Sequence, residues 1–231
     1  MEVNRILYVE DDETLGFLTK EAMEDDGYMV QLYENGLDAQ QAFKKEAFDI
    51  CILDVMLPKK DGFELAKYIR TQNAHIPIIF VTAKSLTADK IAGFEIGGDD
   101  YLVKPYEMAE LLMKIKVFIR RKVIVEPPSD IIKIGQLHFE YGNLQITHAN
   151  GTKSLTQREA DLLFLLYTHR NQLVKRETIL EKLWGRNDYF LGRSMDVFIS
   201  KLRKFLSADK CLEIINYHGI GFKLLLNKNK L

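Results

Sequence analysis

Cysteine is scarce in this chain of 231 residues, which carries only Cys51 and Cys211. Two cysteines so far apart offer neither the disulfide framework of a small secreted domain nor the paired ligands of a zinc site. Long apolar runs are also missing, since no stretch approaches the roughly 20 apolar residues that span a bilayer. The acidic stretch MEVNRILYVEDDE has too short an apolar part for a signal peptide. We therefore expect a cytoplasmic protein with no membrane partner.

Nucleotide-binding loops are absent as well. No strand is followed by GxxxxGKS or GxxxxGKT, the sequence that cradles phosphates in P-loop hydrolases. The sequence GIGF at 219–222 is no dinucleotide loop, because no helix begins after it. These absences argue against an enzyme that uses ATP or a nicotinamide cofactor.

The composition is that of an ordinary globular protein, with 47% hydrophobic and 28% charged residues, and the length suits two domains. The net charge of −1 conceals an asymmetry. Residues 1–121 carry 15 Lys and Arg against 22 Asp and Glu, whereas residues 122–231 carry 17 against 11. An acidic half joined to a basic half indicates two tasks, one of them with a polyanion.

The first half alternates short apolar runs with amphipathic helical stretches. The runs are Arg5–Val9, Tyr28–Tyr33, Asp49–Leu53, Pro77–Val81 and Tyr101–Val103. This alternation predicts a doubly wound α/β domain over residues 1–121, built on a five-stranded parallel sheet. Ligands of such sheets bind outside the carboxyl ends of the strands.

The second half follows another pattern. Pro127 and Pro128 cannot continue a helix, so we expect a linker over residues 122–131. Short alternating segments then precede a helix that begins at Thr156, with Glu159 completing a capping box. Two more helices, at about 176–184 and 193–206, and a closing strand pair follow. This order predicts an α+β winged helix-turn-helix domain over residues 132–231.

Polar residues gather at the carboxyl ends of the predicted parallel strands. The first strand ends in Glu10, Asp11 and Asp12, the third in Asp54, the fourth in Thr82 and the fifth in Lys104. Carboxylates favour Mg²⁺, and a lysine can balance the charge of an aspartate and then of a phosphoryl group. Each residue also has a plainer explanation, because the first acids could cap a helix and Lys104 could face solvent.

Eight spaced motifs resemble one known family over the whole chain. ILYVEDDE, ILDVMLPKKDG, PIIFVTAK and GGDDYLVKPYE are similar to the receiver domain of bacterial two-component response regulators. LTQREADLL, ILEKLWG, SMDVFISKLRKFL and HGIGF resemble the winged-helix effector of the OmpR/PhoB class.

The resemblance implies roles for the pocket residues. Asp54 would accept a phosphoryl group from a partner sensor histidine kinase, with catalytic support from Lys104 and Thr82. Mg²⁺ would bind Asp11, Asp54 and the backbone carbonyl of Met56, with Glu10 acting through water. Thr82 and Tyr101 would form the switch, Tyr101 moving inward after phosphorylation. Beyond this self-phosphorylation and slow hydrolysis of the phosphoaspartate, the resemblance implies no enzyme.

It also implies two interaction surfaces. Activation would form a homodimer through ion pairs on the face of the fourth helix, fifth strand and fifth helix, with Lys90, Glu95, Asp99, Asp100, Glu110, Lys114, Lys116 and Arg121. Double-stranded DNA would meet the third effector helix and the wing, with Arg193, Ser194, Val197, Ser200, Lys201, Arg203, Lys204, His218 and Lys223. The loop 185–192 is where family members that activate transcription meet RNA polymerase.

Three alternative functions can be compared with this one, and the first of them fails. An aspartate-nucleophile phosphohydrolase needs a second acid two residues after the nucleophile, where this chain has Met56. A receiver whose carboxyl-terminal half binds a protein is disfavoured by the basic charge of that half. DNA binding independent of phosphorylation is the third.

Overall fold

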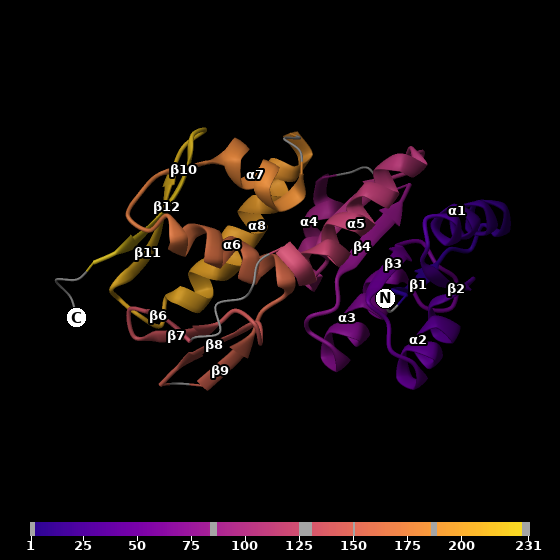
Figure 1. Cartoon of the computed structure of the whole chain (residues 1–231), viewed down its shortest axis with the longest axis horizontal. Coiled ribbons are helices and arrows are strands. Elements are labelled where there is room, and N and C mark those ends of the chain that lie inside the picture. The colour runs from indigo at the N-terminus through magenta and orange to yellow at the C-terminus, as the bar shows by residue number, and fades with distance from the viewer. Residues whose placement is uncertain (1–2, 84–86, 125–130, 150, 186–188, 228–231) are drawn as a thin grey trace. The chain divides into compact units, whose positions relative to one another are not determined.

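The computed structural model describes residues 3–83, 87–124, 131–149, 151–185 and 189–227, with the backbone alone at 87–90, 120–124 and 189–194. The chain divides into two compact units, Met1–Ile124 and Val125–Leu231 (Figure 1). Among the described residues, none of the helices combines the length and apolar character that a bilayer crossing requires.

The first unit contains the expected five-stranded parallel sheet. Its strands are β1 (Arg5–Val9), β2 (Met29–Tyr33), β3 (Ile50–Asp54), β4 (Ile78–Thr82) and β5 (Asp100–Val103), in the order β2-β1-β3-β4-β5. All neighbouring strands are parallel. The strand order reverses between β1 and β3, so the chain segments that leave the carboxyl ends of these two paired strands run in opposite directions, which is where such sheets form their ligand crevice.

Helices cover both faces of this sheet. They are α1 (Glu13–Asp25), α2 (Gly36–Lys45), α3 (Gly62–Gln72), α4 (Thr87–Ile96) and α5 (Met108–Ile124). Met23 of α1 and Leu111, Ile115 and Phe118 of α5 pack in one core with Tyr8 and other residues of the sheet. Helices α2, α3 and α4 pack side by side. Every residue of β3 and β4 is buried, which explains why these strands read as unbroken apolar runs.

The boundary between the units differs slightly from the sequence expectation. Helix α5 continues to Ile124, three residues beyond the expected end of the first domain. Residues 125–130 of the predicted linker lie outside the described residues.

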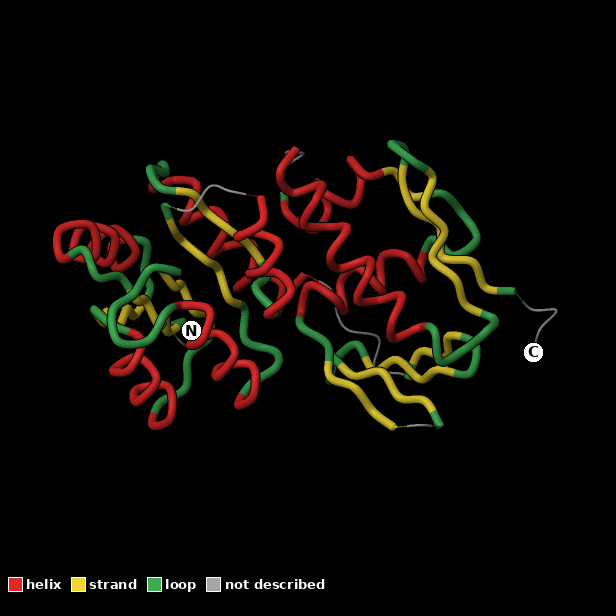
Figure 2. Tube along the Cα trace, turned by 180° about the vertical axis from the view of Figure 1, so that it is seen from behind, coloured by secondary structure: helices red, strands yellow, loops and turns green. Residues whose placement is uncertain are grey.

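The second unit begins with an antiparallel sheet of β6 (Ile132–Ile134), β7 (Leu137–Glu140), β8 (Gln145–His148) and β9 (Gly151–Ser154). Three helices follow, α6 (Gln157–Thr168), α7 (Arg176–Trp184) and α8 (Tyr189–Leu206). The long hairpin of β11 (Leu212–Tyr217) and β12 (Gly221–Leu226) joins the short β10 (Val174–Lys175) in a second sheet, yellow in Figure 2. This is the predicted winged-helix order.

Local signals account for two of these helices. Thr156 caps α6 and Glu159 completes the capping box, as the sequence predicts. Helix α8 begins at Tyr189, about four residues before the expected position. Its buried stripe of Met195, Phe198, Ile199, Leu202 and Leu206 packs it onto the domain core.

Candidate functional site

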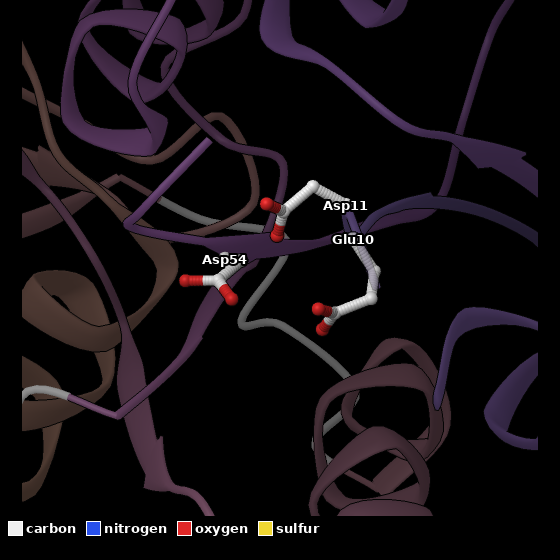
Figure 3. Close-up of side chains that lie close together, drawn as sticks. All are labelled: Glu10, Asp11 and Asp54. Atoms are coloured by element: carbon white, nitrogen blue, oxygen red, sulfur yellow. The ribbon is translucent and has the colours of Figure 1, made fainter. Parts of the chain in front are cut away.

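Three acids converge at the crevice beside β1. Glu10 and Asp11 follow β1, and Asp54 is the last residue of β3. One carboxylate oxygen of each side chain lies within 4.8 Å of one from each of the other two, and Figure 3 shows the three side chains gathered at this place. Asp12 has another role, because its side chain caps α1 by accepting a hydrogen bond from the Leu15 amide at 2.9 Å. The acidic triplet therefore serves both the pocket and the helix start.

Lys104 enters the same pocket from the end of β5. Its Nζ lies 2.5 Å from Asp54 Oδ2 and 2.6 Å from the Glu10 carboxylate. The Lys104–Pro105 peptide bond is cis. The other oxygen of Asp54, Oδ1, accepts a hydrogen bond from the Met56 amide at 2.8 Å. Both carboxylate oxygens of a nearly fully buried aspartate are thus held in place.

Burial and the neighbouring charges shift the pKa values of Glu10 and Lys104 in opposite directions. Burial raises the pKa of Glu10 above its usual range, against the hydrogen bond from Lys104, which lowers it. Burial alone would lower the pKa of Lys104, but hydrogen bonds to Asp54 and Glu10 outweigh it, and that pKa is raised. One ammonium group is therefore shared by two of the three acids, Glu10 and Asp54.

This donor set fits a magnesium ion. Oxygen ligands from one or two carboxylates, with several waters retained, are what Mg²⁺ prefers. Asp11 is exposed and accessible to water, whereas Glu10 and Asp54 lie below it in the pocket. The Met56 carbonyl as a ligand stays a prediction.

The two predicted switch residues lie on neighbouring strands of the same sheet. Thr82 is the last residue of β4 and is fully buried. Tyr101 on β5 is also buried, with its ring 6.1 Å from that of Phe80 and 6.3 Å from that of Phe94. Tyr101 thus occupies the inward position here, and its movement on phosphorylation stays a prediction.

The predicted dimer residues fall into two groups. Asp99 and Asp100 are buried and pair inside the unit, with Arg70 and Lys114 respectively, both at 2.7 Å. Lys116 pairs with Asp26 of α1 at 2.8 Å. Glu95 is exposed and Glu110 half-buried. The side chains of Lys90 and Arg121 lie outside the described residues.

The predicted DNA-binding residues also include some that are paired inside their own unit and others that are exposed. Lys201 of α8 pairs with the buried Glu159 of α6 at 3.1 Å, and Arg203 donates two hydrogen bonds to the Ile214 carbonyl of β11. These two side chains tie α8 to its own domain. Ser200, Lys204 and His218 are exposed, Val197 and Lys223 are half-buried, and the side chains of Arg193 and Ser194 lie outside the described residues.

Sequence reasoning missed two polar contacts in the cores. The hydroxyl of Tyr8 lies 3.4 Å from Glu10 Oε2 and donates to it. The signal was available, since residues two apart on a strand face the same side. Arg158 is fully buried, stacks 4.5 Å above the Trp184 ring and donates to the Leu183 carbonyl. No local pattern predicts that an arginine in a capping sequence is buried.

Known protein families match both units. Residues 6–116 match the response regulator receiver domain, and residues 150–224 match the carboxyl-terminal domain of transcriptional regulatory proteins. The transcriptional regulatory protein RprY of Bacteroides fragilis is 45% identical over 222 residues, which cover 96% of this chain and 94% of that protein. The response regulator ArlR of Staphylococcus saprophyticus is 35% identical over 223 residues, 95% of this chain and 98% of that one.

Solved structures agree with these families. The response regulator DrrB, an OmpR/PhoB homologue from Thermotoga maritima, is 25% identical with a TM-score of 0.53, over 97% of this chain and all of that one. A mutant of RitR, 21% identical with a TM-score of 0.73 over 96% of this chain and 98% of that one, shares the fold. The chain belongs to the two-component response regulators of the OmpR/PhoB class, which are transcriptional regulators and not enzymes.

Proposed function

We propose that Asp54 accepts a phosphoryl group from the phosphohistidine of a partner kinase. An oxygen of its carboxylate forms the new bond to phosphorus, and the bond from phosphorus to the histidine nitrogen breaks. The observation that carries the proposal is the convergence of Asp54, Glu10, Asp11 and Lys104 at one sheet edge. A bound Mg²⁺ would neutralise charge on the phosphoryl oxygens.

The chain's own residues prepare this step. The Met56 amide and Lys104 Nζ orient the two oxygens of Asp54 before the donor arrives. Lys104 also keeps its proton, because its raised pKa favours the ammonium form, so it can contact the transferred group. Thr82 ends β4, the strand beside Asp54, and directly follows Val81, which pairs with Asp54. Its hydroxyl would then donate a hydrogen bond to a phosphoryl oxygen.

The output proposed is sequence-specific DNA binding by a phosphorylation-dependent homodimer. Dimerisation would use the face of α4, β5 and α5, with exposed charges such as Glu95. The exposed side chains of Ser200 and Lys204 on α8 and His218 on the wing suit DNA contacts, and loop 185–192 suits RNA polymerase. Lys201 and Arg203 would hold α8 in position for these contacts, through Glu159 and the Ile214 carbonyl.

Intact mass after incubation with acetyl phosphate and Mg²⁺ tests the phosphoacceptor. One added phosphoryl group is expected in the wild-type protein, and none in Asp54→Asn or without Mg²⁺. An adduct that persists in Asp54→Asn would rule out this residue as the acceptor.

A second experiment separates the two alternatives that remain. A gel shift of promoter DNA fragments, repeated at several salt concentrations and with phosphorylated and Asp54→Asn protein, would measure DNA affinity directly. Equal affinity of both forms would indicate DNA binding independent of phosphorylation. No salt-dependent shift at all would favour a protein partner for the second unit.

A further inference from the structure

The core of the first unit holds a hydroxyl cluster beside the acidic pocket, made of Tyr8, Thr19 and Tyr106. Tyr8 lies next to the carboxyl end of β1, Thr19 is buried on α1, and Tyr106 lies just before α5. Tyr8 and Thr19 are fully buried and Tyr106 is half-buried. A buried hydroxyl is costly unless it is hydrogen-bonded, so a cluster of three at one place calls for an acceptor.

The acceptor is Glu10. The Tyr8 hydroxyl lies 3.4 Å from Glu10 Oε2, and the hydroxyls of Thr19 and Tyr106 lie 3.3 Å apart, beside that of Tyr8. A phenol keeps its proton at neutral pH, and a carboxylate can only accept, so the direction of the Tyr8–Glu10 bond is fixed.

Apart from Tyr8, two donors reach Glu10. Lys104 Nζ lies 2.6 Å from its carboxylate, and the Asp12 amide donates to Oε1 at 3.4 Å, the same length as the Tyr8 contact. Among the described residues, Oε2 therefore has Tyr8 as its donor besides Lys104. A divalent cation would compete with Lys104 for Asp54 and Glu10, because all of these groups lie at the same pocket. A second donor behind Glu10 would keep its carboxylate in place when Lys104 shifts. Such outer contacts orient ligands and tune metal affinity.

We propose that Tyr8 is a positioning residue for the divalent cation of the phosphorylation pocket, acting through its hydrogen bond to Glu10. The inference rests on the proposed function, because it assigns a role to Tyr8 at the same site. Tyr8 holds the carboxylate facing the cation, and the neighbouring hydroxyls of Thr19 and Tyr106 hold the phenol.

Binding of Mn²⁺ to the full chain tests this, with free Mn²⁺ measured by electron paramagnetic resonance. Tyr8→Phe removes the hydroxyl and keeps the ring that packs in the core. The apparent Kd for Mn²⁺ should rise by roughly tenfold, the lower end of the effect that is typical when an outer contact of a ligand is lost. A rise smaller than twofold, or tighter binding, would overturn the proposal.

Tyr33→Phe is the matched control. It deletes the same atom at the end of β2, where the hydroxyl donates to Gln31 Oε1 at 2.8 Å and not to a carboxylate of the pocket. Its Kd for Mn²⁺ should equal that of the wild type, and its far-UV circular dichroism should match that of Tyr8→Phe. A change in Kd equal to that of Tyr8→Phe would point to a general loss of packing and contradict a specific role.

A double-mutant cycle with Glu10→Ala, which removes the acceptor, separates a role through Glu10 from a role in packing. If Tyr8 acts through the carboxylate, adding Tyr8→Phe to Glu10→Ala should change the Kd by less than twofold. A full additional effect would overturn the proposal. Absence of Mn²⁺ binding by the wild-type protein would remove the cation site of the proposed function itself, a result distinct from equal binding by wild type and Tyr8→Phe.

Discussion

Asp100 and Lys114 pair with each other inside the first unit, so a substitution of either one affects folding as well as dimerisation. Both belong to the face expected to form the dimer, yet in this conformation their side chains form a buried pair with exposures of 2% and 4%. Breaking a buried pair by removing one partner leaves an uncompensated charge. Substitution here therefore changes folding stability as well as any contact between subunits.

We expect Asp100→Asn to lower the free energy of unfolding of the first unit by about 3–5 kcal/mol. Urea unfolding followed by far-UV circular dichroism measures this loss. Trp184, the single tryptophan of the chain, lies in the second unit, so its fluorescence should give an unchanged transition. Unchanged stability by both probes would mean that the pair contributes nothing to folding.

At the scale of elements, Asp209 connects the end of α8 to the amino-terminal sheet of the second unit. Its carboxylate accepts hydrogen bonds from the Gln136 amide at 2.7 Å and the Cys211 amide at 2.8 Å. Burial raises its pKa, but these backbone hydrogen bonds outweigh burial and the pKa is lowered below its usual range. Gly135 permits the approach, because a Cβ there would lie 2.2 Å from Asp209 Oδ2.

Asp209→Asn should destabilise the second unit by about 1–3 kcal/mol at neutral pH, because an amide nitrogen cannot accept one of these bonds. A carboxyl with a lowered folded-state pKa contributes stability above its unfolded pKa of about 3.9 and loses it as pH falls through the folded value. The difference between wild type and variant should therefore shrink below about pH 4. Trp184 fluorescence during urea unfolding at pH 7 and pH 3 measures it, and an equal difference at both would contradict a role for the charge.

A further prediction at the scale of elements concerns DNA binding by helix α8. Lys204 is exposed, whereas Lys201 and Arg203 are held by Glu159 and the Ile214 carbonyl. If Lys204 contacts a DNA phosphate, Lys204→Ala should weaken binding to all sequences alike and reduce the slope of log affinity against log salt by about 1. Lys133→Ala is the matched control, since it removes the same charge from an exposed position on β6. Equal slopes of log affinity against log salt for the two variants would show that Lys204 does not contact DNA.

At the scale of the whole molecule, the boundary between the acidic and basic halves, after residue 121, lies three residues from the boundary between the two units, so each charge belongs largely to one unit. Communication between them would pass through dimerisation on the face of α4, β5 and α5. Glu95 gives the clearest test of that face, because it is exposed and its substitution leaves the buried pairs intact.

Glu95→Lys should weaken the dimer of the phosphorylated protein by roughly tenfold, because two symmetric contacts change sign and each exposed pair contributes about 0–1 kcal/mol. Sedimentation equilibrium after acetyl phosphate treatment measures the dissociation constant. Glu34→Lys, an equal charge change in the exposed loop after β2, should leave it unchanged. Equal dissociation constants for Glu95→Lys and wild type would show that the dimer interface does not include Glu95.

The sequence by itself determined the elements, their order and the edge at which the site forms. Apolar periodicity and capping residues such as Thr156 act over a few positions, so the chain carries them locally. Parallel strands bring their carboxyl ends to one edge, and this rule alone predicts that Asp54, Glu10 and Lys104 lie together.

Only the tertiary structure decided which partners these side chains take. Tyr8 meets Glu10 and Thr19, Asp100 meets Lys114, and Lys201 meets Glu159 across distances set by the packing of separate elements. A charge on an amphipathic helix has the same sequence pattern whether it faces solvent, a partner or a buried acid. The physical reason is that burial and pairing depend on the neighbouring element, whose position no local pattern contains.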